Sequence, residues 1–175
     1  CWPSGAASDV YKRPTHPFLV AGGVVGAGAR FVTFEVGSWD THKDNFPMLR
    51  NHRLKELNSG ISNLVKDLEE RDMLDDVTII AWGEFGRTPY WQNLSDEQKK
   101  ENYGRGHNPY GFTTLMAGGG VRGGMTYGTS DEFGMYAQEN RMHVHDFHAT
   151  ILHLMGIDHA KLTYRWRGRD LRLPE

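Results

Sequence analysis

The sequence predicts an α/β fold with a mainly parallel sheet and helices on both of its faces. Residues 51–72 carry apolar side chains at spacings of three and four, which is the pattern of an amphipathic helix. Residues 77–83 form an unbroken apolar run, which suits a strand that is covered on both faces. A strand is also predicted at residues 30–36. Strand, helix, tight turn and strand then follow in the order of a βαβ unit, in which the two strands are parallel.

The composition is that of a globular protein and argues against two classes of partner. The chain has 175 residues, of which 38% are hydrophobic and 24% are charged, so it forms one domain or part of a larger one. The net charge is -2 and the basic residues form no dense run, which gives no electrostatic basis for binding nucleic acid. No apolar stretch approaches the ~20 residues that a membrane-spanning helix needs.

Local patterns define the remaining elements of the N-terminal half. Residues 1–16 lack periodicity and are expected to form a lead-in loop before a domain at residues 17–175. Residues 17–28 carry apolar side chains on one helical face and end at a glycine that suits a helix stop. The strand at 30–36 combines β-branched and aromatic residues, which favour strands.

The C-terminal half begins with a long polar loop at residues 86–110, which includes a short predicted helix at 95–102. Loops of this length inside compact domains are usually functional. The elements expected after it are a strand, a β-ribbon, an amphipathic helix and a charged tail, at residues 112–117, 121–136, 144–155 and 158–175.

Side chains that bind metals or move protons stand next to the three predicted strands. Asp40 and His42 follow the first strand, and Glu84 follows the second. His107 lies in a glycine-rich turn just ahead of the third. Open α/β sheets collect their sites at the carboxyl ends of the strands. We therefore expect these four side chains to meet at the carboxyl edge of the sheet, around a divalent cation.

Three further residues are candidates for the same site. Glu35 lies within the first predicted strand, where a carboxylate is costly unless it is paired or bound to a metal. Arg87 follows Glu84 closely and has the planar fork that binds anionic groups. Arg105 stands two residues before His107 and is expected to face the same anion.

These residues also have structural interpretations that the sequence leaves open. Asp40 can cap a turn, with His42 on the surface, and Glu84 can form a local ion pair with Arg87. A separate zinc site is a further alternative, because several histidines gather at the start of the helix at 144–155. They are His143, His145 and His148.

Five motifs, taken together and in order, are similar to those of a known bacterial family. The motifs are Gly37-Ser-Trp-Asp-Thr-His42, Gly83-Glu-Phe-Gly-Arg-Thr-Pro89, Gly104-Arg-Gly-His-Asn-Pro109, Ala117-Gly-Gly-Gly120 and His148-Ala-Thr-Ile-Leu-His-Leu-Met-Gly-Ile-Asp158. From Pro17 to Leu173 the chain resembles the family catalogued as domain of unknown function 1501, in the alkaline phosphatase-like (sulfatase-like) superfamily. The resemblance implies that residues 17–175 are the C-terminal part of an alkaline phosphatase-like domain. It also implies that the N-terminal part, with the nucleophile, is missing, and that the protein is exported to the periplasm or outside the cell.

The resemblance implies a metal-dependent hydrolase of sulfate or phosphate esters. The substrate would be a small-molecule or carbohydrate anionic ester, and the cofactor a divalent metal such as zinc, calcium or magnesium. The implied metal ligands are Asp40, His42, Glu84, His107 and Glu35, and Arg87 and Arg105 would stabilise the transferred group.

Two positions depart from the pattern that the resemblance implies. Phe85 stands where the superfamily has a histidine ligand, and Gly106 stands where the family usually has an aspartate that supports His107. These departures favour an alternative, which is a non-catalytic binding or surface protein with degenerate metal ligands on the same fold.

Overall fold

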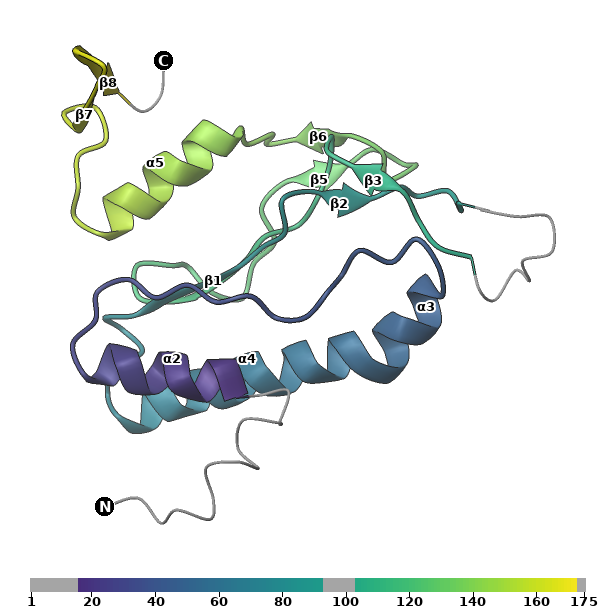
Figure 1. The fold of residues 1–175 in the computed structure, drawn as a ribbon, viewed down its shortest axis with the longest axis horizontal. Helices are drawn as coiled ribbons and strands as arrows, with labels where there is room; N and C mark the ends of the chain where they lie inside the picture. The colour runs from purple at the N-terminus through teal and green to yellow at the C-terminus, as the bar shows by residue number, and fades with distance from the viewer. Residues whose placement is uncertain (1–15, 93–102, 173–175) are drawn as a thin grey trace.

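The structure is a computed structural model that describes residues 16–92 and 103–172, and Figure 1 shows its elements. The helices are α2 (His16–Gly26), α3 (Asn45–Met48), the π-helical turn η1 (Leu49–Arg53), α4 (Leu54–Glu70) and α5 (Val144–Leu154). The strands are β1 (Thr78–Ala81), β2 (Gly86–Arg87), β3 (His107–Asn108), β4 (Leu115–Gly118), β5 (Thr129–Ser130), β6 (Ala137–Glu139), β7 (Thr163–Trp166) and β8 (Arg169–Arg172). The lead-in loop up to residue 15 and the short helix predicted at 95–102 lie outside the described residues.

The predicted parallel sheet with helices on both faces is wrong. In the described part of the chain the strands form four separate two-stranded sheets, β1 with β4, β2 with β3, β5 with β6 and β7 with β8. Every one of these pairs is antiparallel. The βαβ argument needs a strand on each side of the long helix, and the segment before that helix forms no strand. Without that first strand, nothing in the sequence fixes the direction in which β1 pairs.

Residues 30–36, predicted as a strand, form an extended segment that packs on side chains instead of pairing with a strand. Phe34 meets Phe18 of α2 edge to face, with ring centroids 5.0 Å apart. Val36 packs against the core. Figure 1 shows this segment running above α2 and α4 towards α3. The β-branched and aromatic residues that predicted a strand also suit this partly buried position. Their preference for strands reflects how their side chains pack on a half-buried surface, and it does not require the backbone to pair with another strand.

The core lies between α2 and α4. Its buried members are Phe18 of α2 and Leu64 and Leu68 of α4, and apolar side chains around them include Leu57 and Ile61. The predicted apolar stripe of residues 51–72 therefore faces the core. Gly60 of α4 lets the helices approach, because a Cβ at that position would overlap the Phe18 ring. Packing in the core fixes the position of α4. Because α3 and η1 lead directly into α4, it also fixes the start of α3, where the loop with Asp40 and His42 ends.

The C-terminal third differs from its prediction mainly in the strands. The helix predicted at 144–155 is present as α5. The predicted ribbon at 121–136 is displaced, because its paired residues lie at 129–130 and 137–139. The charged tail forms the β7–β8 hairpin, and its turn residues Arg167 and Gly168 have φ values of 47° and 81°. Positive φ at both central residues is the signature of the turn that joins such two-residue hairpins.

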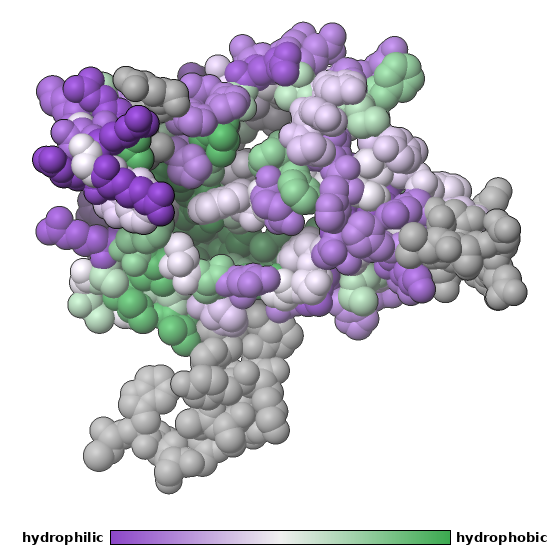
Figure 2. Space-filling model, turned by 45° about the horizontal axis from the view of Figure 1, so that its top comes forward, coloured by the Kyte–Doolittle hydropathy of each residue, from purple (hydrophilic) through white to green (hydrophobic). Residues whose placement is uncertain are grey.

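Much apolar surface is exposed in this arrangement. Trp82 is 52% exposed and Phe112 is 49% exposed, although both lie next to the β1–β4 pair. Figure 2 shows hydrophobic atoms gathered in a hollow on one face, bordered by hydrophilic ones. Within the described ranges, no helix combines the length and apolar character needed to cross a bilayer.

Candidate metal centre

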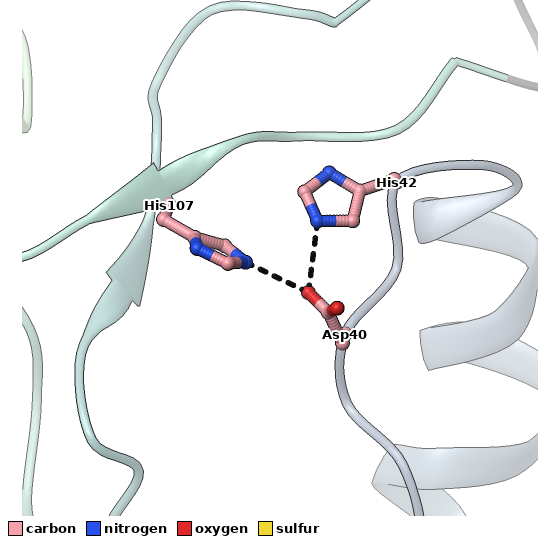
Figure 3. A group of neighbouring side chains, drawn as sticks. All are labelled: Asp40, His42 and His107. Carbon is pink, nitrogen blue, oxygen red and sulfur yellow. Dashed lines mark hydrogen bonds and ion pairs between the residues drawn. The ribbon is translucent and has the colours of Figure 1, made fainter.

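Asp40, His42 and His107 point towards one another from two separate segments, as Figure 3 shows. Asp40 Oδ1 lies 3.0 Å from His42 Nε2 and 2.9 Å from His107 Nε2. One ligand atom from each residue lies within 4.8 Å of the others. Among the described residues, this is the group of three whose ligand atoms lie close enough together to hold a metal ion. Three of the five predicted ligands therefore come together.

The loop before α3 presents Asp40 and His42 on the same side. Thr41 between them is buried, its amide donates to Trp39 O at 2.9 Å, and its hydroxyl bonds the side chain of buried Asn45 at the start of α3. The bond from the Thr41 amide to Trp39 O closes a turn about Asp40, and Thr41 is buried while Asp40 is exposed. The local sequence Asp-Thr-His thus places a carboxylate and an imidazole side by side.

The β2–β3 pair carries His107 to this loop. Arg87 of β2 stands opposite His107 of β3. The amide of Thr88 donates to Gly106 O at 3.0 Å, and the amide of Arg105 donates to Thr41 O at 3.2 Å. The polar stretch at 86–110 therefore begins and ends beside the Asp40 loop, which explains why residues 67 positions apart in the sequence meet.

Arg87 and Arg105, the two arginines predicted at the site, hydrogen-bond across the Asp40 loop and the β2–β3 pair. Arg87 donates from Nη2 to Asp40 Oδ1 at 2.6 Å and to Trp39 O at 2.8 Å. Its Nη1 donates to Arg105 O at 3.1 Å. Arg105 donates to Thr88 O at 2.7 Å, and its guanidinium lies 4.9 Å from the centre of the Phe46 ring. Their predicted contact with a substrate anion stays a prediction.

Gln92 is a site residue that the sequence did not single out. His42 Nδ1 lies 2.6 Å from Gln92 Oε1, so with the amide oxygen accepting, the ring proton sits on Nδ1. The lone pair of Nε2 then faces Asp40 Oδ1, and two acceptors in contact require a proton or a metal cation between them. A metal-bound histidine commonly donates its other N–H to an oxygen in this way. Gln92 lies in a stretch of polar residues, where the sequence offers no signal that marks it.

The spacing of the donors fits a small divalent cation. Metal–ligand distances of ~2.0–2.1 Å in a tetrahedral site place neighbouring ligand atoms roughly 3.3 Å apart. An octahedral site with similar bonds places them roughly 3.0 Å apart. The distances of 2.9 and 3.0 Å from Asp40 Oδ1 to the two imidazoles lie close to these values, and they are also hydrogen-bond lengths, while the three ligand atoms lie within 4.8 Å of one another. Two imidazole nitrogens and one carboxylate are also a donor set that divalent transition metals favour.

The other two predicted ligands lie outside this group. Glu84 and Glu35 are both exposed, and in the described residues no ion pair joins Glu84 to Arg87. Phe85 packs on His107, with ring centroids 4.7 Å apart. Phe85, next to Glu84, thus provides an apolar surface on which the His107 ring packs, and it cannot act as a second metal ligand.

The histidines at the start of α5 cap the helix instead of forming a second metal site. His143 Nδ1 accepts from the amide of His145 at 3.3 Å, and Asp146 Oδ2 accepts from the amide of His143 at 2.8 Å. His148 Nδ1 bonds the carbonyl of Val144 at 2.9 Å. In the part of the chain that the structure describes, these rings do not join into a metal-binding group. Reciprocal capping satisfies amides at the helix start that have no partner within the helix.

Contacts at Asp40 keep its carboxyl group ionised. The hydrogen bond from His107 and then that from Arg87 lower the pKa of Asp40 from 3.8 to about 2. A carboxylate with a depressed folded-state pKa contributes stability above its unfolded value, and this contribution disappears as the pH falls through the folded value. The contribution of Asp40 is therefore complete above pH 3.8 and lost towards pH 2.

Arg87→Met is expected to raise the pKa of Asp40 from about 2 towards 3.8, because it removes one of the two bonds that favour the charged carboxylate. A titration of the Asp40 carboxyl carbon by NMR measures this shift. Arg71→Met removes a comparable bond to Asp67 on α4 and serves as the control, which should leave the Asp40 titration unchanged. An Asp40 pKa that stays near 2 in Arg87→Met would contradict the assigned cause.

The comparisons with known proteins identify one family. The model of the family described as "Protein of unknown function (DUF1501)" matches residues 6–175. No curated protein and no solved structure matches the chain. The matched span includes all five motifs, as well as Asp40, His42 and His107. This match confirms the family expected from the motifs: the chain belongs to the DUF1501 family.

Proposed function

We propose that this chain provides the cation site of a metal-dependent hydrolase of sulfate or phosphate esters. The observation that carries the proposal is the convergence of Asp40 Oδ1 with Nε2 of His42 and of His107. Three protein ligands leave coordination positions for water and for a substrate oxygen, as in catalytic rather than structural metal sites. The exposure of Asp40 and His107 makes those positions accessible from solvent.

The residues of the site have distinct roles in this proposal. A bound divalent cation would supply Lewis acidity, which neutralises ester oxygens and lowers the pKa of a nucleophile. Asp40 supplies the negative charge that binds the cation, and Gln92 orients the His42 ring. Arg87 fixes Asp40, and Arg87 and Arg105 bring positive charge to the segments around the cation site.

The reaction class rests on the motif resemblance to the alkaline phosphatase-like superfamily. The antiparallel pairs of the described residues do not reproduce a mainly parallel sheet, so the motifs and the donor set support the proposal and the sheet does not. Export to the periplasm or the exterior and a small-molecule or carbohydrate ester as substrate belong to the same proposal.

A non-catalytic binding protein is the second candidate. The observation that favours it is Phe85, whose ring packs on His107 where the resemblance places another ligand. A site with one cation and no second metal would then bind an anionic ligand without hydrolysing it.

An assay of the natural full-length protein separates these two functions. Elemental analysis comes first, followed by aryl sulfate and aryl phosphate esters after chelation and after adding back zinc, calcium or magnesium. We expect hydrolysis of one ester class that is lost on chelation and restored by one metal. His107→Ala should abolish the activity, whereas the matched control His148→Ala should retain it. A bound cation with neither ester hydrolysed contradicts the hydrolase and supports the binding protein. A protein that binds no cation also contradicts the hydrolase and fits a non-catalytic protein whose metal ligands are degenerate.

A further inference from the structure

A pocket opens beside the proposed cation site. It is an open depression with a volume of ≈ 380 Å³. Its lining residues are Ser38, Asp40, Thr41, His42, Lys43, Met48 and Arg53. Asp40 and His42 thus belong both to the cation site and to the wall of this pocket. The pocket lies between the loop of the Gly37–His42 motif and the α3–η1 segment.

The side chain of Arg53 packs against the backbone of Gly37 at the wall of this pocket. Arg53 is the last residue of η1, and π-helical turns occur frequently at functional sites. Its guanidinium packs against Gly37, where an added Cβ would overlap Nη1. Gly37 has a φ of 60°, a conformation that favours glycine. The first glycine of the motif therefore makes the space in which this guanidinium lies.

The charge of Arg53 is only partly compensated by other groups. Its Nη1 lies 3.4 Å from Glu56 Oε2, a long contact between neighbours on one helical face. Its Nε is buried, and no group among the described residues accepts a hydrogen bond from it. Lys43 adds a second positive charge to the pocket wall. Arg105 Nε is likewise buried without an acceptor among the described residues, but Arg87 and Arg105 bond to backbone carbonyls, and neither residue lines the pocket.

We propose that this pocket binds a tetrahedral oxyanion, the sulfate or phosphate group of the substrate, and that Arg53 recognises its charge. The inference rests on the proposed function, because it places the oxyanion between the cation ligands Asp40 and His42 and the guanidinium. A planar guanidinium binds such an oxyanion through two parallel N–H donors, which a lysine cannot reproduce. Arg53 becomes the residue that selects an anionic ester over a neutral one.

Calorimetric titration of the full-length protein with inorganic sulfate and with inorganic phosphate tests this inference. We expect Arg53→Met to weaken binding of the preferred anion about tenfold to a hundredfold, the usual effect of losing a hydrogen bond to a charged group. Arg50→Met is the matched control, since Arg50 belongs to the same turn, is exposed and does not line the pocket. It should leave anion binding unchanged, and both variants should keep the wild-type metal content.

The outcomes distinguish this inference from the proposed function. Anion binding that is equal in wild type and Arg53→Met, with a cation bound, overturns the role of Arg53 and leaves the cation site in place. Anion binding that depends on Arg53 in a protein without a cation supports the pocket and contradicts the hydrolase. Failure of the wild type to bind either anion overturns the inference. If Arg53→Met loses its circular-dichroism spectrum, Arg53→Lys replaces it, and its affinity should still fall below that of the wild type.

Discussion

Asp40→Asn is expected to lower the affinity for a divalent cation by more than about a hundredfold. Asp40 supplies the only negative charge of the three-residue group, and its Oδ1 is the atom that both imidazoles approach. An amide oxygen in its place is neutral, and its NH₂ group would face the imidazole nitrogens with the wrong polarity. Loss of residues that merely support metal ligands already costs about 10–100-fold, so loss of a ligand should cost more.

Glu84→Gln and Glu35→Gln provide matched controls for this change. Each removes one carboxylate charge in the same way, at a predicted ligand that the structure leaves outside the group. Competition with a chromophoric chelator gives the affinity of each variant. Both controls should retain wild-type affinity. A loss in Glu84→Gln as large as that in Asp40→Asn would show that the group of three is incomplete.

Gly104→Ala is expected to lower the free energy of unfolding by about 3 kcal/mol or more and to abolish cation binding. A Cβ at this position would overlap the backbone of His42, including its carbonyl carbon and oxygen. Overpacking usually costs about 1–3 kcal/mol, and this case belongs at or above the upper limit because a backbone cannot rotate away as a side chain can. The carbonyl of Gly104 also accepts the hydrogen bond from the amide of Gln92, so the change moves both the His42 backbone and Gln92, the partner of His42 Nδ1.

Gly23→Ala is the control for Gly104→Ala. It lies in the interior of α2, and an added Cβ there would have no neighbour within 4 Å. Alanine should stabilise this helix by about 0.5–1 kcal/mol, because glycine loses more conformational freedom on folding. Urea denaturation measures both changes. Equal stabilities of Gly104→Ala and wild type would contradict the close contact between residue 104 and His42.

The sequence predicted the long helices correctly but did not predict how the strands pair. The stripe that includes Leu64 and Leu68 predicted α4 and its core-facing side, because helical periodicity is a local property of the sequence. The apolar run at 77–83 predicted β1, but a strand's partner is set by distant residues. Gly118 lies opposite Thr78, and no local signal announced that antiparallel register.

The candidate site was predictable where the ligands stand in short motifs. The sequence singled out Asp40, His42 and His107, which the structure brings together, because glycine-rich motifs and predicted strand ends bracket them, although the strand predicted before Asp40 does not form. Glu84 was grouped with them on the assumption of a parallel sheet, which would have brought all strand ends to one edge. The antiparallel pairing removes that edge. Gln92 and Arg53 were missed because their roles depend on contacts across the fold, with His42 and Gly37.

The central claim is that Asp40, His42 and His107 bind one cation. NMR spectra of the histidine ring nitrogens during a Zn²⁺ titration of the full-length protein test it most directly. We predict that Nε2 of His42 and Nε2 of His107 shift together and reach saturation at one equivalent, while the ring nitrogens of His143 and His145 remain unchanged. Saturation of the α5 histidines with no shift at His42 and His107 would contradict the claim.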